Sequence, residues 1–327
     1  MLRFFLKVFL LSFTAIAFSW FVEGAFYTYY YSRSGGEGLA SQFVLPRPAA
    51  VDALVKDTNV LLLGVAGKSY PAPYLTDTII LAMVKASPAS VTLVSIPRDL
   101  IVKVPGGKNV VKINSLYELG KTYSPLEPEK FIKEKTEKIT GIPLDYYAVI
   151  DVVGLEKVID SLGGLDIDVK KPIADPFFPG PHYSYEPFYL EAGLSHLNGH
   201  DAVRFARTRY SKRGDFDRME RQHQLLTAIR EKIGQHSPLP NNVVTLFNEL
   251  KNHFVSNANL QDLPVFLATA LDVKGSAVQS FSLDTSREQG LLISDRLPSG
   301  AYAIMPKAGL ENYKDIQAFF TKLNSNP

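Results

Sequence analysis

Short apolar runs alternate with amphipathic segments along most of this chain, and this alternation points to the α/β class. Three runs rich in Val, Leu and Ile are bounded by Gly, Pro or Ser, which is typical of strands buried on both faces: residues 59–65, 78–84 and 91–96. The pattern further predicts strands at 146–151 and 166–169 and helices at 128–140, 153–162 and 218–233. Because strands and helices interleave, we expect a mixed central sheet flanked by helices, an α/β sandwich.

The C-terminal part gives weaker signals. Residues 242–250, 260–271 and 312–323 are further helix candidates. Residues 175–189 are rich in aromatic residues and proline, and we expect a long ordered loop there.

The N-terminal segment predicts export. Arg3 and Lys7 precede the uncharged stretch 8–22, and aromatic residues crowd its far end. That stretch covers about 22 Å as a helix, short of the ~30 Å hydrocarbon core, but the flanking apolar residues extend it. We favour a retained single-pass anchor at 1–31, with a cytoplasmic N-terminus, over a cleaved signal peptide. Either interpretation exports the rest: a linker at 32–56 and one extracytoplasmic domain at 57–327.

Composition excludes several function classes. The chain has 35 Lys and Arg against 33 Asp and Glu, a net charge of +2, which argues against a nucleic-acid partner. It has no cysteine, so disulfides, thiolate nucleophiles and zinc–thiolate sites are absent. The six histidines lack metal-ligand spacing. Any anion site must therefore be a local cluster of cations.

Arg98 and Asp99 directly follow the predicted strand 91–96. Ligands of α/β sheets bind outside the carboxyl ends of strands, so this pair is a candidate for contact with an anion. A simple ion pair on a loop is the alternative. Asp77, at a strand start, and Lys112 are further candidates that also fit a turn residue and a surface residue.

A second candidate is a cluster of six arginines at positions 204, 207, 209, 213, 218 and 221. Arg218 and Gln222 are four residues apart and in line with Leu225, so they share the buried face of a helix whose N-terminus favours an anion. Arg207 and Arg209 point the same way if the chain is extended there. Alternatively, Asn198 and Gly199 cap the start of a short helix that runs through Phe205, and the two arginines lie just past its end.

The arginine pattern allows two interpretations. Guanidinium groups bind phosphate oxygens in a forked geometry, so several of them with carboxylates suggest a pyrophosphate site, with a divalent metal between its oxygens and Asp. Equally, Arg207, Arg209 and Arg218 could form an internal ion-pair network, whose carboxylates would be Asp215, Asp217 and Glu220. The residue pattern does not separate the two.

A series of motifs in fixed order resembles the LytR-CpsA-Psr family. The series comprises the N-terminal anchor, Asn59-Val-Leu-Leu-Leu-Gly64, Thr76-Asp77-Thr78, Ser95-Ile-Pro-Arg98-Asp99, Lys112-Ile-Asn114, Gly141-Ile-Pro-Leu-Asp-Tyr-Tyr147, Leu162-Gly-Gly-Leu165, Leu197-Asn-Gly199, Arg207-Thr-Arg209, Asp215-Phe-Asp-Arg218 and Arg221-Gln222. Each piece is weak alone, but the ordered series is specific, and it covers residues 59–233.

The resemblance implies a bacterial cell-wall phosphotransferase. Such enzymes move a glycopolymer of the teichoic acid, capsule or arabinogalactan type from a polyprenyl-pyrophosphate carrier at the membrane to peptidoglycan. The family fold is an α/β sandwich with a long apolar groove for the lipid and arginines at its mouth. The resemblance also implies residue roles. The pyrophosphate ligands would be Arg98, Arg207, Arg209, Arg218 and Arg221, and we add Lys112 and Gln222 as candidates.

Arg98, Asp99 and Asp215 are the catalytic candidates, with Asp99 preferred over Asp215 as the base. Asp77 would hold Mg²⁺. The chain departs from the family at Val65-Ala66, where Asp is common, and at Leu75, where Arg is common. These departures weaken the expected metal site. They also leave open two other functions: a scaffold that binds polyprenyl phosphate or glycan without catalysis, and a pyrophosphatase that hydrolyses the lipid carrier.

Overall fold

The computed structural model describes residues 57–86, 88–180, 184–235, 249–258, 278–286, 290–296 and 300–325. They belong to one compact unit spanning residues 53–327. The predicted anchor at 1–31, the linker at 32–56 and the helix expected at 260–271 lie outside the described residues, as does most of 242–250. Within the described ranges, no helix has the length and apolar character needed to cross a bilayer.

Six strands form the central sheet in the order β11–β6–β1–β2–β3–β12. Their bounds are β1 Thr58–Val65, β2 Thr76–Lys85, β3 Ser90–Ser95, β6 Tyr146–Asp151, β11 Phe254–Ser256 and β12 Val278–Ser282. β1 runs antiparallel to β2 and parallel to β6, and β3 runs antiparallel to β2 and parallel to β12. The predicted mixed sheet is confirmed, and its apolar strands lie at the centre.

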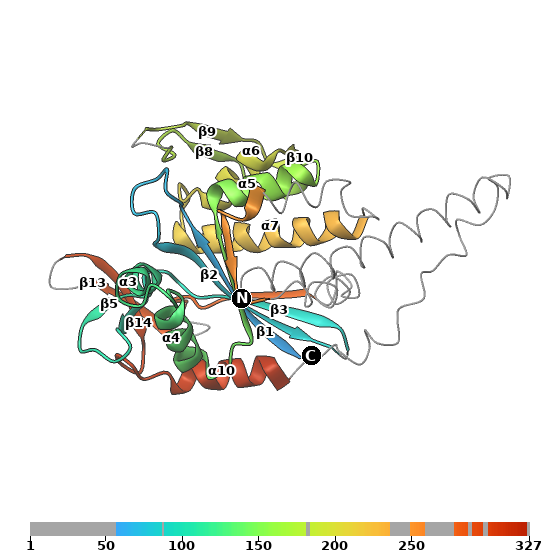
Figure 1. Ribbon diagram of the computed structural model, residues 1–327. Helices are drawn as coiled ribbons and strands as arrows, with labels where there is room; N and C mark the ends of the chain where they lie inside the picture. Colours follow the sequence, from blue (N-terminus) through green and yellow to red (C-terminus); the bar gives the residue numbers. More distant parts are fainter. Residues whose placement is uncertain are drawn as a thin grey trace, which may run out of the picture. The chain divides into compact units, whose positions relative to one another are not determined.

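Helices cover both faces of this sheet (Figure 1). On one face lie α5 (Val152–Ser161), α6 (Gly199–Arg207) and α7 (Asp215–Gln235), and on the other α3 (Leu116–Tyr123), α4 (Lys130–Thr140) and α10 (Lys314–Ser325). Side chains alternate between the faces of a strand. Thus Leu81 packs in the cluster of α4 and α10, whereas Ile80 packs in a cluster that includes Leu226 of α7.

In the described ranges, small two-stranded sheets and a short 3₁₀ helix accompany the central sheet and its helices. They are β4 (Ile101–Lys103) with β5 (Val110–Lys112), β7 (Leu165–Val169) with β10 (Gly193–Leu197), β8 (Ile173–Asp175) with β9 (Phe188–Leu190), β13 (Leu292–Arg296) with β14 (Tyr302–Pro306), and η1 (Ile113–Ser115). The loop expectation for 175–189 is wrong at its ends, because β8 and β9 pair there. Phe178 and Phe188 are buried and in ring contact, which fixes this β8–β9 hairpin on the core.

Residues at the ends of α4 and α6 determine where these helices stop and start. α4 ends at Gly141, whose positive φ of 71° is easily adopted by glycine. Asn198 caps the N-terminus of α6, because its side chain accepts a hydrogen bond from the Asp201 backbone N–H. Gly199 lets α6 approach α5 so closely that a Cβ there would lie 2.2 Å from the Glu156 carbonyl oxygen. α7 begins at Asp215, three residues before the predicted start.

Candidate functional site

Four chain segments converge at the ends of the central strands. Arg98 follows β3, Asp77 lies at the start of β2, Arg207 is the last residue of α6, and Arg218 lies near the start of α7. Of the two arrangements considered for Arg207 and Arg209, the capped helix is the one observed, because α6 runs from Gly199 to Arg207. Residues that are more than a hundred positions apart in sequence thus share one site.

Arg98 lies at the centre of a group of carboxylates. Its Nη1 donates to Asp77 Oδ1, and its Nε lies 3.4 Å from Asp215 Oδ1 and 3.7 Å from Asp99 Oδ2. Burial opposes the charge of Arg98, but Asp77 and Asp215 outweigh it and raise its pKa above the ordinary value. Burial likewise opposes the charge of Asp77, yet the guanidiniums of Arg98 and Arg218 hold the pKa of Asp77 below its usual value.

Arg218 is the most buried cation of the site. Its side chain, as predicted, faces inward: the residue is 3% exposed, and Gln222 beside it is also buried. Arg218 Nη2 forms an ion pair with Asp215 Oδ1 at 2.7 Å and donates a hydrogen bond to the Asp77 carbonyl oxygen at 2.8 Å. Burial lowers the pKa of Arg218 to about 10, so the group remains a cation at neutral pH. Its Nε has no hydrogen-bond partner, which leaves a donor for an anion.

Arg207 and Arg209 differ from these two arginines. In the described part of the chain neither lies within 4 Å of a carboxylate, so the ion-pair interpretation holds for Arg218 with Asp215 and not for Arg207 and Arg209. Arg207 instead packs between two aromatic rings, with its guanidinium carbon 4.6 Å from the Tyr70 centroid and 5.4 Å from that of Phe178. The charge of Arg207 is held in place but not neutralised.

Two cavities meet at these residues. An apolar cavity of about 250 Å³ lies between the sheet and α5, α6 and α7, and is lined by side chains such as Leu62, Ile80, Leu155, Val203 and Leu225. A polar cavity of about 300 Å³ is lined by Arg207, Arg209, Arg218, Asp175, Phe177 and Tyr210. Both cavities are lined by Asp77, Thr78, Arg207 and Gln222. An apolar compartment and a guanidinium-rich compartment therefore adjoin.

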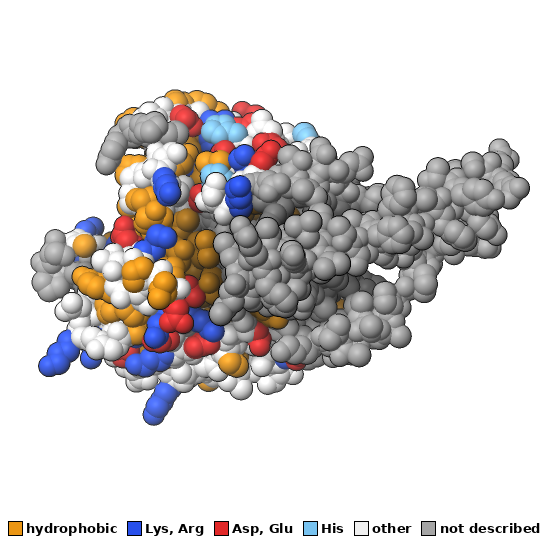
Figure 2. All heavy atoms as spheres, viewed as in Figure 1, with side chains coloured by type: hydrophobic (Ala, Val, Ile, Leu, Met, Phe, Trp, Pro, Cys, Tyr) orange, Lys and Arg blue, Asp and Glu red, His pale blue; other side chains and the backbone are white. Residues whose placement is uncertain are grey.

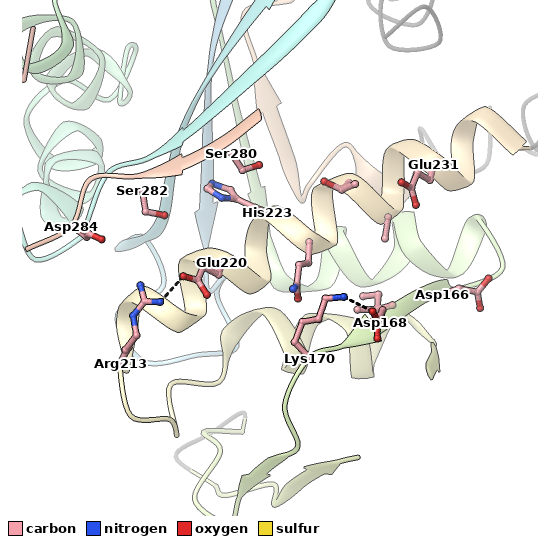
Figure 3. Close-up of a pocket in the computed structure, with 14 residues that line it drawn as sticks. Asp166, Asp168, Lys170, Arg213, Glu220, His223, Glu231, Ser280, Ser282 and Asp284 are labelled. Carbon is pink, nitrogen blue, oxygen red and sulfur yellow. Dashed lines mark hydrogen bonds and ion pairs between the residues drawn. The ribbon is translucent and has the colours of Figure 1, made fainter. Parts of the chain in front are cut away.

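A larger cavity of about 580 Å³ lies on the opposite side of α7 (Figure 3). Residues 220, 223, 224, 227 and 231 of α7 line it, whereas residues 222, 225 and 226 face the apolar cavity. Its charged side chains include Asp166, Asp168, Glu220 and Glu231, and none of the predicted site residues lines it. His223 at its wall is bonded to Ser95 Oγ at 2.8 Å, and burial lowers the pKa of His223 to about 4, so it is neutral.

The remaining predicted residues lie around the two smaller cavities. Lys112 Nζ binds Asp99 Oδ1 at 2.6 Å, next to Arg98. Arg221 lines a neighbouring cavity and donates from Nη2 to the Thr208 carbonyl oxygen. Arg204 and Arg213 of the arginine cluster pair elsewhere, with Asp201 and Glu220. The structure thus brings Arg98, Arg207, Arg209 and Arg218 together. Arg221 lies outside this group and lines a neighbouring cavity.

The donor set fits a metal only in part. Among the described residues, no group of three or more His, Asp or Glu side chains could hold a metal ion. Val65 and Ala66 line the apolar cavity and offer no ligand, while the Asp77 side chain, 41% exposed, lines both cavities. Mg²⁺ in phosphate-binding sites is commonly held by one or two carboxylates together with substrate oxygens. Asp77 suits that arrangement as a single protein ligand.

Several residues at the site were missed from the sequence. Tyr70 and Phe178 hold Arg207, and Asp175 Oδ2 accepts a hydrogen bond from Thr208 Oγ1 at 2.6 Å. The aromatic density of 175–189 was the available signal for Phe178. Around the loop 66–75 and the β8–β9 hairpin, the surface on the left of Figure 2 combines hydrophobic side chains with Lys and Arg side chains.

Comparisons with known proteins agree with this architecture. The crystal structure of TagV from Bacillus subtilis matches 83% of this chain and 99% of its own, with a TM-score of 0.64 and 23% identity. TagT bound to LI-WTA matches 83% of this chain and 90% of its own, with a TM-score of 0.62 and 22% identity. These likenesses establish the fold, and they confirm the predicted α/β class.

Curated relatives match in sequence. The regulatory protein MsrR of Staphylococcus aureus is 32% identical over 178 residues, covering 54% of this chain and 49% of MsrR. The polyisoprenyl-teichoic acid–peptidoglycan teichoic acid transferase TagV of Bacillus subtilis is 30% identical over 198 residues, covering 58% of this chain and 47% of TagV. The chain thus matches about half the length of these relatives. The model of the LytR_cpsA_psr family spans residues 43–316, which confirms the resemblance seen in the ordered motifs. The chain belongs to the LytR_cpsA_psr family.

Proposed function

We propose that this protein is a membrane-anchored phosphotransferase that moves a glycopolymer from a polyprenyl-pyrophosphate carrier to peptidoglycan during cell-wall assembly. One observation carries the proposal: an apolar cavity opens onto a group of guanidiniums, two of which have no carboxylate partner. A polyprenyl diphosphate has this combination of a long apolar chain and a dense negative charge. The name of the TagV relative, a teichoic acid transferase, supports the same reaction class.

Each part of the ligand has a candidate partner. The apolar cavity would take the chain nearest the diphosphate, and Arg207, Arg209 and Arg218 would bind the phosphate oxygens in forked geometry. Asp77 and Asp215 hold Arg98 and Arg218 in place. Lys112, Arg221 and Gln222 complete the candidate set, with Lys112 and Arg221 acting through Asp99 and Thr208.

The proposed reaction is a phosphoryl transfer. An acceptor hydroxyl oxygen attacks the phosphorus that carries the glycan, a new P–O bond forms, and the bond to the bridging oxygen breaks, so that lipid phosphate leaves. Arg98 and the other guanidiniums stabilise the charge that builds on the transferred group and the leaving phosphate. We assign the hydroxyl proton to Asp99 ahead of Asp215. Two guanidiniums lie 2.7 and 3.4 Å from Asp215 Oδ1, whereas Lys112 engages only Oδ1 of Asp99 and its Oδ2 lies 3.7 Å from Arg98 Nε.

Magnesium dependence is part of the proposal. Asp77 would be the protein ligand, and phosphate oxygens of the substrate would supply the others. When bound, the metal would add positive charge beside the diphosphate. The steps above rely on the arginines and Asp99, without the metal.

We further propose that the chain is a single-pass protein of the cell membrane, with a cytoplasmic N-terminus and the site outside. The uncharged stretch 8–22 after Arg3 and Lys7 supports this placement. The near-neutral net charge supports the expectation that nucleic acid is not a partner.

The departures at Ala66 and Leu75 favour a second candidate, a scaffold that binds the lipid or glycan without turnover. Water in place of the sugar acceptor would give a third, a pyrophosphatase of the lipid carrier.

Transfer of glycan from a lipid-pyrophosphate donor to peptidoglycan by the full chain tests the proposal. We expect Arg98→Ala and Arg207→Ala to lower turnover by about 100-fold or more, the effect of removing a charge-stabilising group. Arg213→Ala is the matched control, since Arg213 belongs to the same arginine cluster but pairs with Glu220 outside the two cavities. Normal transfer in both variants would refute the assigned roles. Tight lipid binding without turnover under any divalent metal would select the scaffold, and release of free glycan phosphate would select the pyrophosphatase.

A further inference from the structure

The β8–β9 hairpin is apolar on both of its sides. On the inner side, Phe178 and Phe188 are buried in the core. On the outer side, Tyr185 is 68% exposed and Tyr189 is 65% exposed. An antiparallel pair of strands with one solvated side normally alternates between apolar side chains toward the core and polar ones toward water. An outer side that keeps large rings in water is typical of a surface that binds a partner.

Cross-strand pairing places these tyrosines beside further exposed apolar residues. Tyr189 opposes Ala174, and Tyr185 opposes Pro179. Phe177, which is 63% exposed, is in ring contact with Tyr185, their centroids 5.9 Å apart. Figure 2 shows hydrophobic side chains along the top of the view, where Figure 1 places β8 and β9. We call Ala174, Phe177, Pro179, Tyr185 and Tyr189 the hairpin patch.

The charges around the hairpin patch favour an anionic partner. The hairpin segment has two carboxylates, of which Asp175 is buried and Glu186 lies 3.6 Å from the His200 ring. Lys171, directly before β8, and Lys212 line the cavity that also contains Arg221. Both lysines are exposed, and within the described ranges neither lies within 4 Å of a carboxylate. Free ammonium groups beside an uncharged apolar patch favour an anionic lipid surface.

The hairpin patch is held next to the arginines of the site. Asp175 Oδ2 accepts a hydrogen bond from Thr208 Oγ1 at 2.6 Å, and Thr208 lies between Arg207 and Arg209 in sequence. Phe177 of the patch lines the polar cavity together with these two arginines. A surface that receives the hairpin patch therefore comes to the mouth of the polar cavity.

The headgroup layer of a lipid bilayer matches these features. Tyrosine, with an apolar ring and a polar end, concentrates at this level of membranes, and basic side chains add attraction to anionic headgroups. The diphosphate of a polyprenyl carrier lies at the same level. Glycan strands also pack on tyrosine rings, but the hairpin patch has no amide or carboxylate side chain to bind sugar hydroxyls.

We propose that the hairpin patch docks on the headgroup layer of the membrane and holds the arginine-lined mouth of the site at the depth of the lipid diphosphate. The inference rests on the proposed function for the identity of that lipid. The contact itself is with the bilayer surface and does not require turnover.

Quenching of a tryptophan reporter in vesicles tests the contact. The full chain is reconstituted in vesicles of phosphatidylcholine and phosphatidylglycerol with brominated acyl chains. Trp20→Phe is the background, because Trp20 is the single tryptophan of the sequence. We expect Tyr185→Trp to lose much of its emission relative to vesicles without bromine, and Lys322→Trp to lose none. Lys322 is the matched control, because it is an exposed residue of α10, which covers the opposite face of the sheet (Figure 1).

Kinetics with two forms of the donor give a second measurement. Tyr185 and Tyr189 line neither the apolar nor the polar cavity. In the reconstituted chain, we expect Tyr185→Ser with Tyr189→Ser to raise the KM for a long-chain donor in the bilayer several-fold, because the buried apolar area of the contact is lost. The KM for a short-chain donor dissolved in the buffer stays as in the wild type. Phe at both positions retains the rings and the wild-type KM.

The remaining outcomes separate this inference from the proposed function. Equal emission of the two reporters with and without bromine would place the hairpin away from the bilayer, whatever the catalytic activity. Quenching of Tyr185→Trp in a chain that transfers no glycan would support the docking and refute the proposed function. Emission that changes with added peptidoglycan strands but not with bromine would make the hairpin patch a glycan surface. Loss of self-association in the double serine variant, without quenching of the reporter, would make it an interface between copies of the chain.

Discussion

At the scale of single residues, Arg207 shows how a charge is positioned without being neutralised. Its guanidinium packs between the rings of Tyr70 and Phe178, and Tyr70 is held in a closed loop by the hydrogen bond from its N–H to the Gly67 carbonyl oxygen at 3.1 Å. A ring face attracts a cation but leaves its N–H groups free to donate in the plane of the guanidinium. A carboxylate in the place of these rings would compete with phosphate for the N–H groups of the Arg207 guanidinium.

We therefore expect Tyr70→Leu to raise the KM for the lipid donor by about threefold to tenfold, the range of one cation–π contact, with a smaller change in kcat. Tyr70→Phe keeps the ring face and should stay near the wild type. Steady-state kinetics of transfer in the three proteins check this. If Tyr70→Phe raises the KM for the lipid donor as much as Tyr70→Leu does, the hydroxyl of Tyr70 is required and the explanation by its ring face is wrong.

The residues of the site differ in how far the sequence alone predicts them. Arg218 and Gln222 share a helical face with Leu225, so their inward orientation followed from spacing, and both are buried. The capping motif at Asn198 identified α6 as one of two alternatives. Tyr70 and Phe178 were not predictable, because their contact with Arg207 joins three segments distant in sequence. Residue roles and magnesium use stay predictions.

At the scale of elements, one carboxylate ties α4 to the segment after β14. Glu311 accepts hydrogen bonds from Lys135 and Lys138 of α4, from the Lys103 backbone N–H and from the Tyr313 hydroxyl. Glu311 adopts a positive φ of 65°, which is unfavourable for a residue with a Cβ, and these four partners outweigh that strain. Lys135 is only 3% exposed, so Glu311 is its essential counter-charge.

Stability below pH 5 should depend on Glu311. Burial raises the pKa of this carboxyl, but its hydrogen bonds from Lys135 and Lys138 outweigh burial and lower the pKa to about 2. The unfolded chain binds this proton near pH 4.5, so the contribution of Glu311 is full above that value and is lost as the pH falls toward 2.

We expect Glu311→Gln to destabilise the fold by about 3 kcal/mol at pH 7, because Lys135 loses its partner, and to flatten the pH dependence between about 5 and 2. Urea unfolding at several pH values measures both quantities. Glu134→Gln on α4 is the control, as no ion pair of Glu134 is among those of the described residues. An unchanged pH profile in Glu311→Gln would contradict the assignment.

Element prediction worked where apolar periodicity was strong. β1, β2, β3, β6, β7, α4, α5, α7 and α10 all lie within a few residues of their expected positions. The strands β12, β13 and β14 were missed, because sequences such as Leu292–Arg296 contain one buried residue followed by exposed ones and give no alternating signal. Long-range pairing with β3 and with the 98–100 turn determines their structure.

At the scale of the whole molecule, the C-terminal third completes the core. β12 adds a parallel strand to β3, and Leu283, Leu292, Ile304, Ile316 and Phe320 belong to the main hydrophobic cluster. The segment with the clearest family motifs, 59–233, contains none of these residues. Without the C-terminal residues, the sheet strands and the helices α3 and α4 of this segment would lose the apolar side chains that pack against them.

A chain ended after residue 233 should therefore lose cooperative unfolding, although it keeps every predicted site residue. Removal of several fully buried apolar side chains opens the core, and each contributes about 2 kcal/mol or more. Thermal unfolding followed by near-ultraviolet circular dichroism, with a chain ended at residue 325 as the control, gives the readout. A sharp transition in the shorter chain would show that the motif-bearing part folds alone.

The uncompensated pair Arg207 and Arg209 has a last consequence, because it lies in a molecule of almost balanced charge. Without a large field around the whole protein, an anionic substrate is not drawn from solution over long distances. With the membrane anchor that we propose, encounter would then depend on lateral diffusion within the lipid layer, and dissolved salt would change the rate of capture only slightly.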